Sequence, residues 1–344
     1  RSTASVFDIS PLIKYRIKGK DAEIFLNKLT VRNVCLQKIN TVQYTMWCDD
    51  NGSVLDDGTL FKFDVDDFRI CCQERNLPWL IDTSLGFDVK IIEETEDIAG
   101  LSIQGPTSAS VLIKAGYNLI EKLKPFEMIE TQDKLLISRT GFTGDLGYEI
   151  FLPNKLAKIT WDKIWKAGEN LGIKAIGLNA LNIARIETGF IIANSDFITS
   201  EHALRNNRIR NPDEIGMSWM VDLTKPYFNG KNALIKIRDN NESKFVFAAL
   251  EIDGKEPAEG AIIYYNKKQE VGIVTAATWS PTAKKSIALA SLKLPYGDEI
   301  QSNLWVEIYV LRELEYYKMM KKVIIVKAPF VKLKRRNITP PLSK

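Results

Sequence analysis

Apolar residues recur at spacings of three and four positions in several segments, as they do on one face of an α-helix. Ala22, Phe25, Leu26 and Leu29 form the clearest example, and a glycine directly after Thr188 supplies a stop signal for another. Two of the predicted helices cover residues 22–29 and 178–188. A third begins after Gly105-Pro106 and runs through Leu112, and a fourth ends near Gly172. Core packing explains their apolar faces.

Short runs of β-branched and aromatic residues, separated by turn residues, predict strands between these helices. In the first half of the chain the predicted strands are 41–47, 59–63, 68–72, 100–103 and 135–138. After about residue 240 the helical pattern stops, and further strand runs follow at 245–252, 261–265, 272–278, 287–292, 304–310 and 323–326. Their regular spacing predicts a separate C-terminal β-barrel or sandwich.

The length of 344 residues suits two or three domains, because single hydrophobic cores stop growing below this size. Apolar residues make up 45% and charged residues 26% of the chain, and no apolar run approaches the roughly 18 residues that cross a bilayer. We therefore expect a soluble protein with no membrane partner. The tail from Arg335 onward contains Pro340-Pro341, and we expect it to be frayed.

The net charge of +4 is small for this length, which argues against a nucleic-acid partner. Four cysteines show no CxxC spacing, and two of them are adjacent, so reduced thiols in a cytoplasmic protein are expected. No basic segment followed by an apolar stretch marks a secretory signal at the start. The cysteines are Cys35, Cys48, Cys71 and Cys72.

The only histidine, His202, excludes a multi-histidine metal site, and no metal is expected. Its polar neighbours indicate a surface residue rather than a member of a catalytic triad. The glycines at 141, 144 and 147 do not fit GxGxxG, and no GxxxxGK[ST] loop precedes a helix. A nucleotide-binding site is therefore disfavoured.

The predicted helix 178–188 carries a carboxylate on its apolar face, and a carboxylate in such a position needs a hydrogen-bonding or charged partner. Glu187 follows Ala180, Ile183 and Ala184 on an apolar stripe of that helix. Arg185 is one candidate for a structural ion pair, although adjacent helical positions point apart. A ligand that offers paired N–H donors is the other, and the pattern leaves both open.

Asp56 and Asp57 follow a turn at Asn51-Gly52, where acidic residues commonly cap or solvate a loop. A carboxylate in a pocket could instead orient an amine or exchange its proton. The segment Trp279-Ser280-Pro281 is interpreted as an aromatic strand end and a turn.

Seven segments resemble, in the right order, the motifs of one family, the folate-dependent aminomethyltransferases or glycine cleavage T-proteins. Phe7 to Ser10 is similar to FDVS, and Gly52 to Asp57 to GGxxDD. The other five are Leu101 to Pro106 (LxxQGP), Arg139 to Glu149 (RTGYTGExGYE), Arg185 to Gly189 (RLEAG), Gly216 to Asp222 with Phe228 to Lys231 (GLxWxVxxxxxxFxGK) and Val274 to Leu289 (VTSGTxSPTxxxxIAL). The resemblance spans essentially the whole chain.

The resemblance implies an α+β fold, a cloverleaf of two α+β lobes around a central folate channel with a ferredoxin-like second lobe and a C-terminal β-barrel. On this basis residues 1–238 form the folate-binding region of two lobes, and residues 239–344 form the β-barrel domain. It also implies a tetrahydrofolate-dependent transferase that moves a methyl or aminomethyl-derived one-carbon group from a small substrate to folate.

The family's site residues map onto particular positions of this chain. Glu187 matches the glutamate that accepts hydrogen bonds from the pterin ring, and Asp56 matches the catalytic aspartate beside the reactive folate nitrogens. Tyr44 matches a tyrosine that lines the channel. Asp57 is then expected to be structural.

Further cofactor-binding residues follow from the same resemblance. Ile70 and Cys72 fall on the strand that contacts the pterin, and Lys225 falls near the benzoyl-glutamate end of folate, although it could simply belong to a solvated face. Tyr148 of the RTGFTGDLGYE segment and Trp279 of the WSPT turn complete the set.

Several positions depart from the family pattern and leave the donor open. Pro11 follows the FDVS-like motif where a histidine is usual, Gln73 stands for an asparagine, and Ala258 stands for an arginine. The donor could be a methylated amine, an aminomethyl group on a lipoyl carrier protein, or a sulfonium compound, as in the related dimethylsulfoniopropionate demethylases. A non-catalytic folate-binding regulatory or assembly protein is the alternative of another class.

Overall fold

The computed structural model describes residues 1–297 and 303–338, and the chain divides into two compact units. Unit 1 contains residues 1–47, 56–181 and the described residues from Leu333 onward. Unit 2 contains residues 48–55 and 182–332. The predicted boundary at residue 238 remains a prediction.

The first sheet of unit 1 has six strands in the order β11-β1-β7-β10-β9-β8. Tyr148 and Ile150 of β10 and Ile103 of β7 belong to the core between this sheet and helices α3 (Ser108–Lys114) and α4 (Ala157–Gly168). The strands are β1 (Ser5–Asp8), β7 (Ile98–Gln104), β8 (Met128–Glu130), β9 (Leu136–Ser138), β10 (Gly147–Pro153) and β11 (Lys174–Ala175).

Two of the sequence motifs are used to build this sheet. The side-chain amide of Gln104 donates to Ser102 Oγ and to the carbonyl oxygen of Thr140, at 3.0 and 3.2 Å. A Cβ atom at Gly141 or Gly147 would lie 2.1 or 2.0 Å from Gln104 Oε1, so both positions require glycine. The side chain of Gln104 in the LSIQGP segment therefore packs against the glycines of the RTGFTGDLGYE segment, and this contact stabilises the sheet.

The second sheet of unit 1 has five strands in the order β3-β4-β5-β2-β6. Helix α1 (Ala22–Leu29) buries Phe25 and Leu26, as its apolar spacing predicts. The strands are β2 (Ile13–Lys18), β3 (Thr41–Cys48), β4 (Val54–Asp64), β5 (Asp67–Cys72) and β6 (Lys90–Glu93), and helix α2 (Leu77–Thr83) follows β5.

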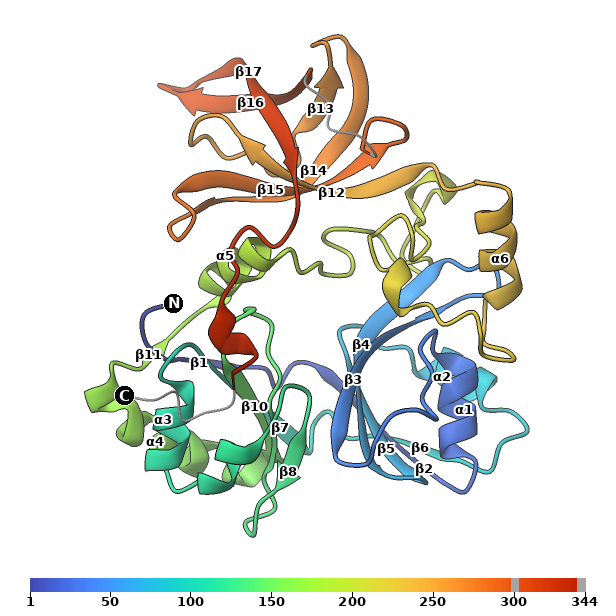
Figure 1. Ribbon diagram of the computed structural model, residues 1–344, viewed down its shortest axis with the longest axis vertical. Helices are drawn as coiled ribbons and strands as arrows, with labels where there is room; N and C mark the ends of the chain where they lie inside the picture. Colours follow the sequence, from blue (N-terminus) through green and yellow to red (C-terminus); the bar gives the residue numbers. More distant parts are fainter. Residues whose placement is uncertain (298–302, 339–344) are drawn as a thin grey trace. The chain divides into compact units, whose positions relative to one another are not determined.

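Unit 2 contains most of helix α5 (Leu178–Thr188), helix α6 (Lys231–Asp239) and a closed barrel in the order β12-β15-β14-β13-β16-β17 (Figure 1). Alternate residues such as Ala248, Leu250 and Ile252 point into the barrel core. The barrel strands are β12 (Phe245–Ile252), β13 (Ile262–Tyr265), β14 (Gln269–Ser280), β15 (Lys285–Lys293), β16 (Leu304–Arg312) and β17 (Glu315–Val326).

Short 3₁₀ turns complete the chain: η1 (Asn118–Lys122), η2 (Asn154–Leu156), η3 (Glu169–Leu171), η4 (Asn206–Arg208), η5 (Ser218–Met220) and η6 (Lys334–Arg336). Over residues 1–297 and 303–338, no helix has both the length and the apolar character needed to span a membrane.

The predicted α+β class and the C-terminal barrel are confirmed, and β12 and α5 have the predicted bounds. The placement of the Asp56–Asp57 pair in a loop was wrong, because both lie inside β4. The fraying of the tail was also wrong as far as Ile338: Arg335 donates to both oxygens of Asp145 at 2.6 and 2.8 Å. The rest of the predicted tail lies outside the described residues.

Candidate functional site

The Asp56 carboxylate is completely buried in unit 1 and accepts three N–H groups. Its Oδ1 accepts the main-chain N–H of Asp57 at 2.8 Å. Its Oδ2 accepts the main-chain N–H of Glu74 at 3.1 Å and the side-chain amide of Asn76 at 3.0 Å. Because each carboxylate oxygen has two lone pairs, Oδ1 keeps one acceptor position. Asp56 therefore has capacity for one more donor, at Oδ1.

The neighbouring carboxylate has a different partner. Asp57 is half-buried, and its Oδ2 accepts the hydroxyl of Tyr44 at 2.7 Å. Tyr44 lies on β3, the strand next to β4, and its carbonyl oxygen accepts Arg32 Nη1 at 3.0 Å. The structure thus joins Tyr44 to Asp57, the neighbour of Asp56 on β4. The roles of Tyr44 and Asp56 toward folate remain predictions.

Burial and crowding of negative charge shift the protonation of this cluster. Burial, followed by the charge of Asp57, raises the pKa of Asp56 well above the ordinary range of an aspartate. Burial also raises the pKa of Asp57, against the opposing effect of the Tyr44 hydroxyl. Two adjacent carboxylates, one buried and one half-buried, resist double ionisation, so the pair holds a proton more tightly than a solvated aspartate does.

Ile70 and Cys72 lie on β5, between β4 and β2. Ile70 is in register with Leu60 on one side and Tyr15 on the other, so its main-chain groups belong to the sheet ladder. The thiol of Cys72 donates to the carbonyl oxygen of Glu74 at 3.3 Å, and burial raises the pKa of this thiol. Contact of either residue with folate remains a prediction.

Tyr148 lies on β10 of the six-stranded sheet, whereas Asp56 lies on β4 of the five-stranded sheet. It is buried in the hydrophobic core, and its hydroxyl has no hydrogen-bond partner among the described residues. Burial raises its pKa to about 12. The structure does not bring Tyr148 together with the aspartates by any hydrogen bond that it describes, and its cofactor-binding role stays a prediction.

Glu187 is buried at the end of α5 in unit 2. Its Oε1 accepts the hydroxyl of Ser280 at 2.7 Å, and its carbonyl oxygen accepts the N–H of Val331 at 3.0 Å. Two segments more than 90 residues further along the chain therefore fix its position.

The predicted alternative of an Arg185–Glu187 ion pair is wrong, because Arg185 pairs with Asp196 at 2.5 Å. Arg185 also donates to Asn182 Oδ1, and Asp196 accepts the hydroxyl of Thr275, both at 2.7 Å. This buried ion pair fixes the segment after Gly189, because Arg185 also donates to the carbonyl oxygen of Phe190 and Asp196 accepts the main-chain N–H of Ile192. Asp196 was not predicted from the sequence, since its partners are distant in the chain.

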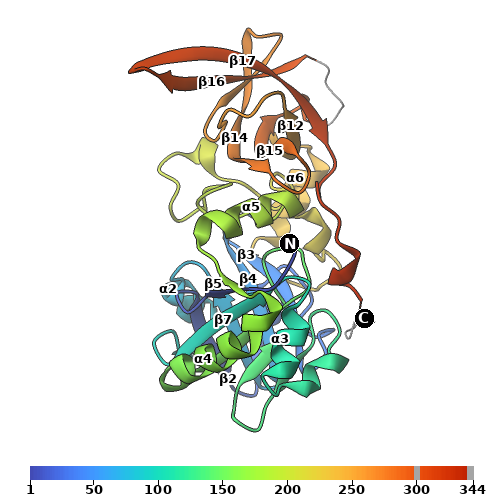
Figure 2. The same cartoon turned by 90° about the vertical axis from the view of Figure 1, so that its left-hand side faces the viewer.

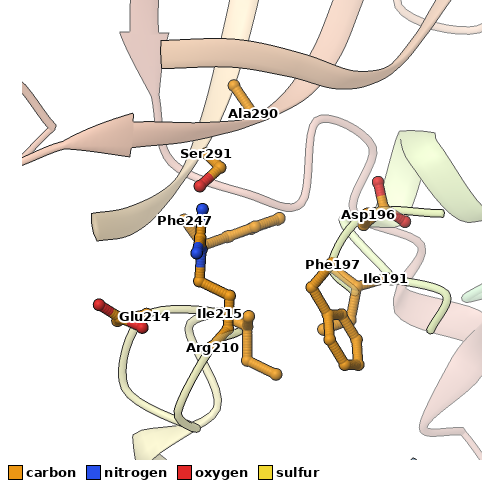
Figure 3. A pocket seen from close by; sticks show the side chains of 9 residues that line it. All are labelled: Ile191, Asp196, Phe197, Arg210, Glu214, Ile215, Phe247, Ala290 and Ser291. Atoms are coloured by element: carbon orange, nitrogen blue, oxygen red, sulfur yellow. The ribbon is translucent and has the colours of Figure 1, made fainter. Parts of the chain in front are cut away.

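Beside this ion pair lies a cavity of about 10 Å³, shown in Figure 3, into which Arg210 points toward Ser291. The hydroxyl of Ser291 has no partner among the described residues. This volume holds a single water molecule. The cavity is therefore too small for a folate-sized ligand. Its lining consists of Ile191, Asp196, Phe197, Arg210, Glu214, Ile215, Phe247, Ala290 and Ser291.

Lys225 and Trp279 have contrasting surroundings in unit 2. The interpretation of Lys225 as part of a solvated face is wrong, since it is 1% exposed and its Nζ lies 4.9 Å from the ring centroid of Phe228. Trp279 is 38% exposed, carries Lys255 Nζ at 4.9 Å from its ring centroid, and directly precedes Ser280. Trp279 thus adjoins the hydroxyl that binds Glu187.

A larger cavity of about 370 Å³ opens in unit 1. Pro11, one of the residues that depart from the family pattern, lines it together with Ser10 and Arg75. Arg75 lies between Glu74 and Asn76, both of which donate to Asp56. Pro11 therefore lines a cavity next to the segment 74–76, whose N–H groups hold the carboxylate of Asp56.

Besides Asp196, two further residues of these clusters were missed by the sequence analysis. Asn76 precedes α2, a helix that the apolar pattern did not predict, and Ser280 was interpreted only as part of a turn. A polar residue at a helix start is ordinarily assigned to capping. Asn76 and Ser280 are recognised as part of the clusters only from their hydrogen bonds to Asp56 and Glu187, which are distant in the sequence.

Comparisons with known proteins place the chain in a known family. A family profile described as GCVT N-terminal domain matches residues 1–225, and one described as glycine cleavage T-protein C-terminal barrel domain matches residues 245–332. A protein of Thermoanaerobacter pseudethanolicus named aminomethyltransferase is 31% identical over 312 residues, covering 88% of this chain and 82% of the relative. A Clostridium botulinum protein of the same name is 30% identical and covers 86% of this chain and 80% of the relative.

A solved structure supports the same fold. The glycine cleavage system aminomethyltransferase T of Bartonella henselae superimposes with a TM-score of 0.84 at 23% identity, covering 96% of this chain and 87% of that chain. The chain therefore belongs to the glycine cleavage T-protein family of aminomethyltransferases, which confirms both the family and the class of enzyme predicted from the motifs.

Proposed function

We propose that this protein transfers an aminomethyl-derived one-carbon group from a small donor to tetrahydrofolate. Family membership supports aminomethyl transfer. The observation that carries the proposal is the buried carboxylate Asp56, which lies beside a second carboxylate and retains an acceptor position at Oδ1. Tetrahydrofolate, when bound, supplies the nitrogen that accepts the one-carbon group.

The described residues fit a reduced folate. The pterin ring presents N–H donors, and Glu187 is a buried carboxylate suited to accept them. Asn76 Oδ1, next to the amide nitrogen that donates to Asp56, is buried without a partner among the described residues, so it too can accept an N–H group. Lys225 supplies a buried positive charge suited to a carboxylate of the folate tail.

Asp56 is proposed to exchange a proton during transfer. The amides of Glu74 and Asn76 occupy Oδ2, which directs an exchangeable proton to Oδ1. Burial and Asp57 raise the pKa of Asp56 toward the working range of a general acid or base. Tyr44 holds Asp57 and thereby positions the second carboxylate.

Glu187 is proposed to anchor and orient the pterin ring without exchanging protons. Ser280 donates to Oε1 and fixes the orientation of the carboxylate, so that its acceptor geometry is set before the ligand arrives. The roles of Ile70, Cys72 and Tyr148 as further folate contacts are secondary parts of the same proposal.

The named relatives favour an aminomethyl donor over a sulfonium donor. An amine needs correct protonation of its leaving nitrogen, whereas a sulfonium leaves as a neutral sulfide without a proton. The raised pKa of Asp56 suits the first demand. A lipoyl carrier protein remains the proposed partner that presents the aminomethyl group.

The test is a donor screen with purified protein and tetrahydrofolate, in which folate products are identified by mass spectrometry. Aminomethyl groups on a lipoyl carrier, free methylated amines and sulfonium compounds are supplied in separate reactions. Methylenetetrahydrofolate formed only with the aminomethyl donor supports the proposal. Methyltetrahydrofolate formed from a sulfonium, or no folate product with any donor, overturns it.

A further inference from the structure

The hairpin of β16 and β17 extends beyond the rest of the barrel, as Figure 2 shows. Barrel neighbours cover only its base: β13 pairs with residues 304–307 of β16, and β12 pairs with residues 323–326 of β17. We call residues 308–322 the ribbon. Among the described strands, the outer edge of β17 from Glu315 to Lys321 has no strand partner.

The ribbon exposes large apolar side chains. Leu314 at the turn is 94% exposed and Tyr316 is 71% exposed. Exposed apolar residues that are grouped on one element, rather than scattered, mark an interaction surface. The others on the ribbon are Tyr309, Leu311 and Tyr317.

Charges along this edge follow a self-complementary order. In a strand, residues two apart share a face, so Glu315, Tyr317, Met319 and Lys321 lie on one face of β17. The acidic residue is at one end of this row and the basic residue is at the other. An antiparallel copy of the same row therefore places each charge opposite its counterion.

We propose that the β17 edge from Glu315 to Lys321 pairs antiparallel with the same edge of a second copy of this chain. A two-fold axis perpendicular to the ribbon relates the copies. Lys318 then lies opposite its own copy, Tyr317 lies opposite the partner's Met319, and Glu315 lies opposite the partner's Lys321. Main-chain groups of an otherwise open strand edge become paired.

Charge selects this register over its neighbours. In the adjacent symmetric registers Glu315 faces the partner's Met319 or the partner's Val323. In the first of these, Lys321 faces the partner's Glu313, which lies in the turn outside β17 and not on the paired strand edge. Each cross-strand pair of opposite charges stabilises a sheet by about 0.2–1 kcal/mol. The two central Lys318 side chains are each neutralised by Glu307 of their own chain, at 2.5 Å. Lysines on the edge oppose pairing with unrelated strands.

A cysteine at the symmetry axis gives the sharpest test. Opposite Cα atoms in antiparallel strands lie roughly 4.5–5.5 Å apart, within the range that a disulfide spans. Lys318→Cys, made together with Cys35→Ser to remove the exposed native thiol, is expected to form a disulfide-linked dimer under mild oxidation. The matched control is Tyr316→Cys, whose two copies lie about 13 Å apart along the strands.

Light scattering of the wild-type protein supplies a measurement that needs no variant. Since an edge contact is small, dimer mass is expected to appear between about 10 and 500 µM, above the range of tight obligate dimers. Glu315→Lys should return the protein to a monomer, because it places like charges opposite each other across the edge. Lys321 is not swapped, because its Nζ also pairs with Glu256 of its own chain at 3.2 Å. Equal cross-linking at positions 318 and 316, or a wild-type monomer across the whole range, overturns the proposal.

Discussion

Two buried carboxylates of this chain belong to the same chemical class but have different neighbours. Asp56 in unit 1 lies next to a second carboxylate, and three N–H groups hold it. Glu187 in unit 2 accepts the hydroxyl of Ser280, while the nearest arginine in sequence is paired elsewhere, with Asp196. The described partners therefore differ: a second carboxylate adjoins Asp56, and a hydroxyl donates to Glu187.

This difference in partners suits one carboxylate to proton exchange and the other to ligand anchoring. A second carboxylate beside a buried acid makes its proton harder to remove, which suits proton exchange. A hydroxyl beside a buried carboxylate adds no charge and only fixes its acceptor geometry, which suits anchoring. Asp56 is therefore expected to act on turnover, and Glu187 on affinity.

The largest expected effect is on turnover in Asp56→Asn. The amide keeps the shape of the side chain but cannot exchange a proton with the folate nitrogen. Turnover with an aminomethyl donor should fall by roughly 10²–10⁴-fold, the usual contribution of a placed acid or base, while folate affinity changes little. Single-turnover kinetics and calorimetric titration measure the two quantities separately.

Asp57→Asn is the matched control for this comparison, because it removes the neighbouring charge and keeps Asp56. We expect a smaller loss of turnover and a lower pKa of Asp56, since the charge of Asp57 is one cause of its elevation. If Asp57→Asn loses more turnover than Asp56→Asn, the proton-exchanging carboxylate is Asp57.

The next effect is on affinity in Glu187→Gln. Glutamine replaces one of two acceptor oxygens with an amide, so folate binding should weaken by about 1.5–3 kcal/mol, roughly 10- to 150-fold. Ser280→Ala keeps the carboxylate and removes one donor to it, so a smaller loss is expected. Equal folate affinity in wild type and Glu187→Gln, measured by calorimetry, would exclude the anchoring role.

Local pattern explains which parts of the fold could be predicted. Helix α5 and strand β12 have strong periodicity and clear stop signals, so their bounds follow from sequence. The turn at Asn51-Gly52 suggested a loop at Asp56, yet β4 begins at Val54 and contains both aspartates, as a strand that lies between β3 and β5. Tertiary pairing overrode local composition there.

The candidate site was only partly predictable for a similar reason. Motif positions identified Asp56 and Glu187, but Asn76 and Ser280 reach them from 20 and 93 residues away in the chain. No local pattern encodes such partners. Conversely, the glycine-rich segment at 139–149 looked like a possible site, and its glycines instead make room for Gln104.

A third effect concerns the position of the pH profile. The Asn76 amide donates to Asp56 and so favours its charged form, which means that Asn76→Ala should raise the pKa of Asp56 further. The acidic limb of turnover should then move to higher pH, with about a tenfold loss at neutral pH. The charged or titratable groups that act on Asp56 are Asp57 and Glu74, with Tyr44 and Cys72 close by.

Asn154→Ala provides the control for that shift. Asn154 belongs to the same unit, and its amide donates to the carbonyl oxygen of Glu96. Removing it should leave the pH profile in place. A profile that stays unmoved in Asn76→Ala, with turnover reduced only through lower stability, would make Asn76 a purely structural residue.

The smallest effect is spectroscopic and sharpens the Glu187 side of the comparison. Trp279 directly precedes Ser280, which donates to Glu187, and its ring is partly exposed, so a pterin held by Glu187 should alter its emission. Trp279→Phe should abolish most of the change in fluorescence and weaken folate binding by no more than about 1 kcal/mol, the scale of one aromatic contact. Trp161→Phe is the control, because Trp161 packs against the core of unit 1 and should leave the change intact. If the fluorescence change persists in Trp279→Phe and disappears in Trp161→Phe, the ligand reports on unit 1 alone, and the assignment of the pterin to Glu187 fails.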